Sequence, residues 1–324
     1  MFFIVLDELN FCCVLQTLHN FMETQNNVTE FVFIGLWGNK KIELLFFFLF
    51  LLCYLAVLMG NFIIFLTITC SHLMQQPMYY FLCHLSFMDF SYTSTVIPRL
   101  ITDLAAARRN ISYNNCMTQI FTAHLLAGVE IFILFFMAFD HYIAIVKPLN
   151  RQSCDMLMVL AWAVGFWHSI ALLLMVLKLP FCGPNQIDHY LCDVKPLLKL
   201  VCKDIHVVSI LVIANSGMVV VVIFLVLVAS YIVILYNLRI HSSAGRKKSL
   251  STCSSHITVV VLFFVPCIYT YILPAGSKNK DKDISVFYTV IAPMLNPLIY
   301  TLRNMEMKIA MRKVWAKVAH SGLK

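Results

Sequence analysis

Two carboxylic acids lie inside long apolar stretches of this sequence. Asp89 follows Leu85-Ser86-Phe87-Met88, and Glu130 lies near the middle of a later stretch. An ionisable group at mid-membrane depth is costly and usually functional. Two facing carboxylates repel each other unless a proton or a cation lies between them. We therefore predict a sodium or proton site formed by Asp89 and Glu130, with Asn296 nearby. The alternative is two independent protonated acids, each hydrogen-bonded to a neighbouring helix.

Two further polar groups lie where apolar stretches end. Asp140-His141-Tyr142 closes one stretch, and Asn296-Pro297-Leu298-Ile299-Tyr300 lies near the end of the last one. Proline removes a helical hydrogen bond and bends its helix. We interpret the two groups together as a movable gate at the inner face of a membrane protein. The alternative for the first group is an ordinary helix end, whose polar side chains reach interfacial water.

The composition identifies the solvent that surrounds these stretches. The chain has 324 residues, of which 60% are hydrophobic and 12% are charged, whereas soluble chains carry about 25% charged residues. The surrounding solvent must therefore be largely lipid. The net charge of +8 comes from basic residues between and after the apolar stretches, which indicates cytoplasmic loops and not nucleic acid binding. We find no zinc-binding motif and no nucleophile–base pair, so an enzyme is not favoured.

Seven apolar stretches are each close to or above the ~20 residues that a helix needs to cross hydrocarbon. They are residues 44–69, 78–101, 117–146, 157–179, 207–238, 250–273 and 284–302. In lipid the backbone must satisfy its own hydrogen bonds, which favours helices even where Val and Ile are frequent. We therefore predict an all-α membrane protein, a seven-transmembrane helix bundle. Residues 304–318 fit a short amphipathic helix on the inner membrane surface, with a disordered basic tail as the alternative.

The distribution of Lys and Arg predicts the orientation. Basic residues dominate the loop after the fifth stretch and the tail after the seventh, so both should be cytoplasmic and the N-terminus extracellular. The loop after the fourth stretch also has four Lys, but its three cysteines favour the oxidising side. We divide the chain into an extracellular N-terminus (1–43), a membrane domain (44–302) and a cytoplasmic tail (303–324).

The N-terminal residues raise two separate questions. Acidic residues interrupt the apolar residues of segment 1–21, so it lacks the features of a secretory signal. We interpret it as an upstream extension, with Met22 as an alternative start. Asn27-Val28-Thr29 is a glycosylation acceptor if this end is outside, and Asn110-Ile111-Ser112 is a weaker match close to a membrane boundary.

Six motifs resemble those of olfactory receptors, a family of rhodopsin-like G-protein-coupled receptors. They are residues 77–82 (PMYYFL), 85–89 (LSFMD), 137–149 (MAFDHYIAIVKPL), Ser230-Tyr231, 248–256 (KSLSTCSSH) and 293–304 (PMLNPLIYTLRN). In the family's order, they cover the chain from about residue 22 to 314. The resemblance implies a receptor for a small odorant that activates a stimulatory olfactory-type heterotrimeric G protein and so raises cyclic AMP. It also implies a coupling switch made of Asp140, His141, Tyr142, Tyr231, Asn296, Pro297 and Tyr300.

The same resemblance implies two disulfides, Cys116–Cys192 and Cys182–Cys202, although four cysteines alone allow three pairings. It also places a ligand site in the outer half of the bundle, where an apolar cleft with few polar groups is expected. The expected lining residues are His124, Gly128, Asn215, Ser216, Phe264, Cys267, Ile268, Tyr271, Val286 and Thr289. The alternative for His124 and Asn215 is that they only make interhelical hydrogen bonds. The lining predicts a small, largely hydrophobic ligand with one hydrogen-bonding group.

One position departs from the family pattern, because His141 stands where the family has Arg. Histidine is shorter, lacks the five-donor fork of arginine and is mostly neutral near pH 7 when unperturbed. Asp140 would favour the charged form of His141, so some pairing could persist. We expect weaker locking at rest and weaker coupling, and a folded but silent receptor is one alternative. A transporter or channel that uses Asp89, Glu130 and Asn296 is another, but no internal repeat supports it.

Overall fold

The computed structural model describes residues 28–34, 40–106, 109–143, 149–181, 185–202, 210–238, 243–272 and 280–321. The extension 1–21, the alternative start Met22, the acceptor Asn27 and Cys182 lie outside these ranges. The side chain of Tyr271 is also outside the description.

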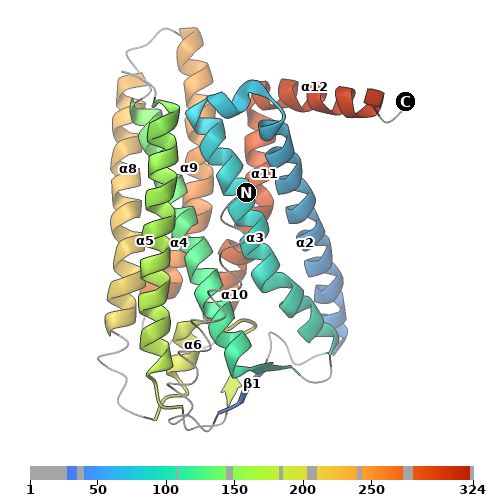
Figure 1. The fold of residues 1–324 in the computed structure, drawn as a ribbon, viewed down its shortest axis with the longest axis vertical. Helices are drawn as coiled ribbons and strands as arrows, with labels where there is room; N and C mark the ends of the chain where they lie inside the picture. Colours follow the sequence, from blue (N-terminus) through green and yellow to red (C-terminus); the bar gives the residue numbers. More distant parts are fainter. Residues whose placement is uncertain are drawn as a thin grey trace.

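Long helices packed side by side form most of the molecule (Figure 1). Their bounds are α2 (Lys40–Thr69), α3 (Pro77–Ala105), α4 (Tyr113–Ile143), α5 (Arg151–Leu177), α8 (Met218–Leu238), α9 (Ser243–Ile272), α10 (Lys280–Val286) and α11 (Ala292–Arg303). Two π-helical segments, η2 (Ile213–Gly217) and η3 (Phe287–Ile291), precede α8 and α11. The helices form although several are rich in Val and Ile, because hydrocarbon offers no other partner for the backbone.

Six helices in the described part of the chain are long and apolar enough to cross a membrane. The seventh expected span corresponds to α3, which has 29 residues but is not among the six. Its sequence carries Asp89, Arg99, Asp103 and many hydroxyl groups, which lower its hydropathy. It packs between α2 and α4 (Figure 1), so the bundle covers most of these polar groups.

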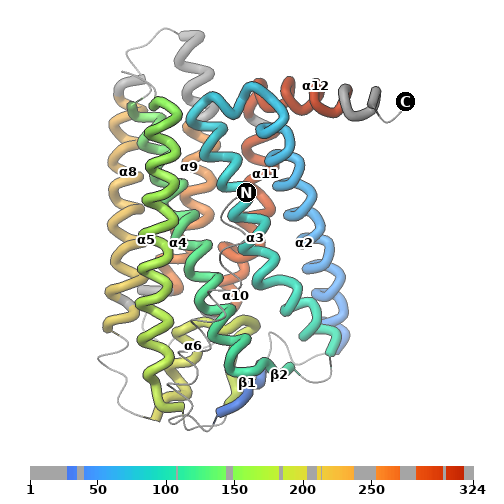
Figure 2. The backbone as a smooth tube through the Cα atoms, viewed as in Figure 1, coloured from blue at the N-terminus to red at the C-terminus, as the bar shows by residue number. Residues whose placement is uncertain are grey.

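Opposite ends of the bundle carry different small elements. At one end, β1 (Glu30–Phe33) pairs with β2 (Asn110–Ser112) antiparallel and with β3 (Gln186–Ile187) parallel. At the other, α12 (Met305–Ser321) lies roughly perpendicular to the long helices, as the tube view shows (Figure 2). We call these the sheet end and the α12 end. The sheet, which α6 (Val194–Leu198) accompanies, adds a minor β element to the expected all-α fold.

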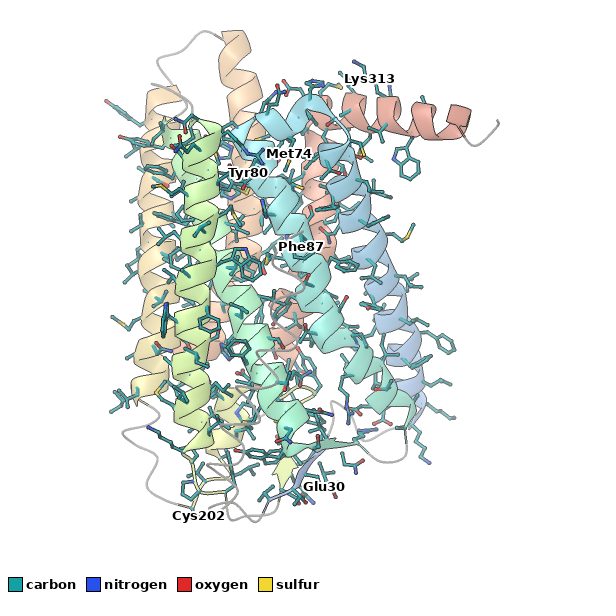
Figure 3. All side chains as sticks on the ribbon, viewed as in Figure 1. Glu30, Met74, Tyr80, Phe87, Cys202 and Lys313 are labelled. Carbon is teal, nitrogen blue, oxygen red and sulfur yellow. A yellow bond between two sulfur atoms is a disulfide. The ribbon has the colours of Figure 1, made fainter. Side chains whose placement is uncertain are left out.

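The outer surface of the bundle is apolar. Side chains project outward from the outer helices (Figure 3), and Leu52, Trp167 and Leu225 are 67%, 70% and 60% exposed. Exposed apolar area of this extent is unfavourable in water but suits lipid. The interior is packed closely, since a Cβ atom added to Gly165 of α5 would lie 3.0 Å from Val129 of α4.

The amphipathic helix predicted at residues 304–318 corresponds to α12. Its first turn is tied to α3, because the Tyr79 hydroxyl donates to Asn304 Oδ1 at 2.8 Å and to Glu306 Oε2 at 3.2 Å. Met307 and Ala310 are buried against the bundle, whereas Met305 and Ile309 are exposed. The helix therefore presents apolar side chains to its surroundings at the level where the long helices end.

Candidate ligand-binding site

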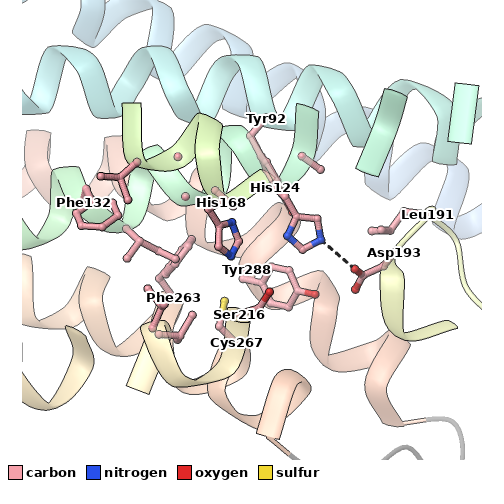
Figure 4. Close-up of a pocket in the computed structure, with 18 of the residues that line it drawn as sticks. Tyr92, His124, Phe132, His168, Leu191, Asp193, Ser216, Phe263, Cys267 and Tyr288 are labelled. Atoms are coloured by element: carbon pink, nitrogen blue, oxygen red, sulfur yellow. Dashed lines mark hydrogen bonds and ion pairs between the residues drawn. The ribbon is translucent and has the colours of Figure 1, made fainter. Parts of the chain in front are cut away.

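A cavity with about 1050 Å³ of empty space, its opening included, lies within the bundle toward the sheet end. Helices α3, α4, α5, α8 and α9, the segments η2 and η3, and the loop after β3 all contribute to its wall (Figure 4). Most of the lining is apolar or aromatic, with Tyr92, Ile131, Phe132, Leu191, Val219, Phe263 and Tyr288 among the larger side chains. Such a lining, with few polar groups, is typical of sites for small molecules.

One polar pair in the cavity wall is internally satisfied. His124 Nε2 of α4 lies 3.3 Å from Asp193 Oδ1, and the Val194 backbone N–H donates to the same oxygen at 2.7 Å (Figure 4). Burial alone would raise the pKa of the Asp193 carboxyl. That pKa is nevertheless held below its ordinary value by the hydrogen bond from His124, the nearby His124 and His189 rings, and the Val194 N–H. Asp193 is thus an anion whose hydrogen-bond partners are already in place.

Two other polar groups in the wall are not satisfied by the described protein atoms. His168 Nδ1 of α5 and Ser216 Oγ of η2 are buried without a hydrogen-bond partner there. The His168 ring centre lies 6.2 Å from that of His124. Leaving a buried polar group unpaired costs ~1–3 kcal/mol. A ligand that pairs with either atom would therefore recover free energy that the empty site lacks.

Four of the ten expected ligand residues line the cavity. They are His124, Gly128, Ser216 and Cys267. Phe263, His168 and Tyr288 also line it, although our sequence reasoning did not include them. A signal existed for His168, because it is an ionisable residue inside an apolar stretch.

Five other expected residues are not part of this lining, and the side chain of the sixth, Tyr271, lies outside the description. Phe264 is buried and stacks on Phe224, with ring centres 5.8 Å apart, and Ile268 packs against the same core. Thr289 shares a hydrogen bond with the Tyr190 hydroxyl at 2.9 Å. The other two are Val286, which packs against a cluster near α3, and Asn215, which is half-buried beside the cavity residue Ser216.

A disulfide joins Cys116 at the start of α4 to Cys192 in the loop after β3. It fixes the loop segment that carries Asp193 against the cavity, because Cys192 itself lines the wall. Its backbone N–H also donates to Gln119 Oε1 at 3.0 Å. Cys202 is disulfide-bonded as well, and its expected partner Cys182 lies outside the described residues.

The carboxylates Asp89 and Glu130 are both buried in the middle of the bundle. Asn296 Nδ2 donates to Asp89 Oδ2 at 2.9 Å, and Asp89 is close enough to Glu130 to interact electrostatically. Asp89 Oδ1 and Glu130 Oε1 have no hydrogen-bond partner among the described residues. The arrangement therefore brings together the three residues that the sequence analysis grouped, with carboxylate oxygens available to a proton or a cation.

A second group lies at the α12 end. His141 of α4 and His256 of α9 have ring centres 5.5 Å apart, and the Tyr231 hydroxyl of α8 contacts His256 Nδ1. The expected pairing of Asp140 with His141 is not present in the described structure, since both His141 ring nitrogens lack a hydrogen-bond partner there. Successive residues of a helix point about 100° apart, so the two side chains diverge.

Three other expected switch residues lie in different surroundings. Tyr142 is exposed, whereas Tyr300 is buried and its hydroxyl has no hydrogen-bond partner among the described residues. Pro297 packs against Gly60, where an added Cβ would lie 3.0 Å from the proline ring. Helices α4, α8, α9 and α11 therefore carry polar groups toward the α12 end that a change in helix positions could re-pair.

Comparison with known proteins identifies the family. The olfactory receptor family model matches residues 50–317. Human olfactory receptor 4A47 is 51% identical over 302 residues, which cover 91% of this chain and 98% of the relative. Mouse olfactory receptor 4B13 is 49% identical over 300 residues, which cover 91% of this chain and 98% of the relative. The chain belongs to the olfactory receptor family.

A solved structure supports the fold independently. The crystal structure of squid rhodopsin superposes with a TM-score of 0.66 at 13% identity and covers 87% of each chain. The receptor bundle is therefore shared with rhodopsin. The family assignment also establishes that the chain is a multi-pass membrane receptor and not an enzyme.

Proposed function

We propose that this receptor binds a small, mostly apolar volatile ligand in the cavity and activates a stimulatory olfactory-type G protein, which raises cyclic AMP. The observation that carries the proposal is the apolar cavity with His168 Nδ1 and Ser216 Oγ left unpaired by the described residues. An apolar ligand body fits the wall, and one hydrogen-bonding group on the ligand would pair with these atoms.

The charge balance of the cavity favours a neutral ligand. Asp193 already pairs with His124, so a cationic ligand would have to displace His124 from Asp193. An anionic ligand would be repelled by Asp193. An alcohol, aldehyde or ketone avoids both penalties, and its oxygen can bond to either a hydroxyl or an imidazole N–H.

The proposed orientation places the sheet end outside the cell and the α12 end in the cytoplasm. The basic residues after the fifth span and in α12 support it through the positive-inside rule. The disulfide Cys116–Cys192 lies at the sheet end, which fits the oxidising side. Membrane lipid would contact the exposed apolar faces of α2, α5 and α8.

We also propose that a sodium ion binds between Asp89 and Glu130. The support is the burial of both carboxylates, each with an oxygen that the described residues leave unpaired. Within the described chain no group of three or more His, Cys, Asp or Glu could hold a metal, so the two acids and neutral oxygens would have to suffice. A shared proton is the competing explanation of the same geometry.

The experiment is a cyclic AMP reporter assay in transfected cells. Cells with the receptor at the surface are exposed to matched series of alcohols, aldehydes, carboxylic acids, amines and hydrocarbons of equal carbon number. We expect responses confined to neutral oxygen-bearing compounds. Responses to hydrocarbons alone would contradict the role of the polar atoms, and responses to amines alone would point to Asp193 as the ligand partner.

A further inference from the structure

The histidine pair at the α12 end is unusual because most of its ring nitrogens are buried without a hydrogen-bond partner among the described residues. His256 is fully buried, and its Nε2 has no hydrogen-bond partner in the part of the chain described. The same holds for Nδ1 and Nε2 of His141, although the Met137 backbone interacts with the ring without reaching hydrogen-bond geometry. Buried ring nitrogens without a close partner on two neighbouring histidines require an explanation, since each carries a desolvation cost.

The spacing of the two rings matches that of two imidazoles on one metal ion. Zinc lies ~2.0–2.1 Å from a ligating histidine nitrogen, so two imidazole centres on a tetrahedral ion are roughly 5 Å apart. The observed separation of the ring centres is 5.5 Å. The two residues come from different helices, α4 and α9, so an ion held by both would bridge them.

Tyr231 supplies the support that a metal-binding histidine needs. Ligating histidines almost always donate their second ring N–H to an oxygen, which fixes the tautomer. The Tyr231 hydroxyl contacts His256 Nδ1, so with Nδ1–H donated to this oxygen, Nε2 presents its lone pair. Asp140, adjacent to His141, is buried with Oδ1 unpaired among the described residues and would offset part of the charge of a cation.

We propose that His141 and His256 form a binding site for a divalent transition metal of the zinc type, and that the bound ion clamps the ends of α4 and α9 together. Neutral imidazole nitrogens donate the two protein lone pairs, and water completes the coordination. The site depends on the residue that departs from the family pattern, because an arginine at position 141 is always protonated and has no lone pair to donate. The inference is independent of the odorant and of G-protein coupling.

The test uses the purified full-length chain in lipid nanodiscs, with zinc chloride alone as the probe. Bound zinc per chain is measured by equilibrium dialysis, and melting temperature is followed with and without zinc. We expect His141→Arg and His256→Ala each to lose one bound zinc per chain and the zinc-dependent rise in melting temperature. Tyr231→Phe should weaken binding about 10-fold, as loss of a supporting hydrogen bond does.

Two controls separate this site from general metal binding and from misfolding. His72→Ala removes an exposed histidine at the same end and should leave the zinc count unchanged. His141→Gln keeps a neutral polar side chain, and helical content by circular dichroism shows whether each variant is folded. Equal zinc binding and an equal zinc effect on melting in the unmodified chain and folded His141→Arg would overturn the proposal.

Discussion

At the scale of single residues, Ser216 and His168 are the polar residues that would select the ligand. Both line the cavity from different elements, and each has an unpaired buried atom within the described structure. His124 lines the same wall but is already paired with Asp193. Ligand recognition is therefore expected to depend more on Ser216 and His168 than on the paired histidine.

Ser216→Ala should weaken the response to a neutral oxygen-bearing odorant about 2- to 10-fold in potency, since a net hydrogen bond contributes ~0.5–1.5 kcal/mol. The variant leaves the apolar wall intact, so the maximal response should be retained. Dose–response curves in the cyclic AMP reporter give the potency. Ser230→Ala, on α8 but outside the cavity lining, is the matched control, and an equal loss in both variants would remove Ser216 from ligand recognition.

Asp193→Asn should lower the melting temperature at neutral pH, because it removes the carboxylate that pairs with His124 and the Val194 N–H. The sign with pH follows from the depressed pKa of Asp193. A carboxylate whose pKa in the folded protein is below the unfolded value of about 3.9 stabilises the folded state above that pH. This stabilisation is lost as the pH falls through the pKa of the folded state. The difference in melting temperature between the unmodified chain and Asp193→Asn should therefore become smaller below about pH 4.

Melting of the purified receptor between pH 6 and pH 3 measures this effect. Asp188→Asn is the control, because Asp188 lies in the same loop with a more exposed side chain, 42% against 7% for Asp193. If the difference in melting temperature between the unmodified chain and Asp193→Asn stays constant down to pH 3, the carboxylate does not act through its charge.

Asp89→Asn should abolish any dependence of ligand response or melting on sodium, because it removes one of the two carboxylates of the proposed site. The change keeps the size of the side chain. Melting curves in sodium chloride and in N-methylglucamine chloride at equal ionic strength test it. A sodium effect that persists unchanged in Asp89→Asn would show that sodium acts at another site, which leaves the shared proton as the explanation of this one.

At the scale of helices, hydropathy predicted where the spans lie but not how they are rotated. The expected lining followed the resemblance to the family, which named Val286 with Thr289 and Asn215 with Ser216. The π-helical segments η2 and η3 run through or next to these positions. A π turn adds a residue to the helical repeat and rotates the face presented by the next residues, so Tyr288 lines the cavity while Thr289 bonds to Tyr190.

The sixth span shows a similar limit. Phe264 and Phe263 are adjacent, but only Phe263 lines the cavity, whereas Phe264 stacks on Phe224. Both are aromatic, and no pattern in the sequence distinguishes which one faces inward. In contrast, the grouping of Asp89 with Glu130 and Asn296 was accessible, because ionisable residues in spans turn toward the interior of a bundle.

Gly165→Ala tests the contact between α4 and α5. The new Cβ would lie 3.0 Å from Val129 Cγ2 and 3.3 Å from the Leu125 carbonyl oxygen, so the backbone must move. We expect a loss of ~1–3 kcal/mol in stability, as for other overpacked sites. Gly128→Ala is the matched control across the same interface, with its nearest atom at 3.4 Å. The melting temperature of Gly165→Ala should be clearly lower than that of Gly128→Ala. The reverse order would contradict the close contact between α4 and α5 at Gly165.

At the scale of the whole molecule, the cavity near the sheet end and the histidine pair near the α12 end lie at opposite parts of the bundle. Helices α4 and α9 contribute residues to both, through His124 with His141 and Cys267 with His256. A ligand can shift such a bundle only if it binds one arrangement of the helices more tightly than another. His141 would alter how that shift is transmitted at the α12 end without changing the cavity.

The most direct measurement is the cyclic AMP response to an odorant panel at matched surface density. It compares the full chain, the form that starts at Met22, and His141→Arg, each with and without Ser216→Ala. The account predicts that one set of neutral oxygen-bearing odorants activates all three forms, most strongly with His141→Arg, and that Ser216→Ala lowers potency in each. Failure of every odorant to activate any of the three forms, despite equal surface expression, would contradict it.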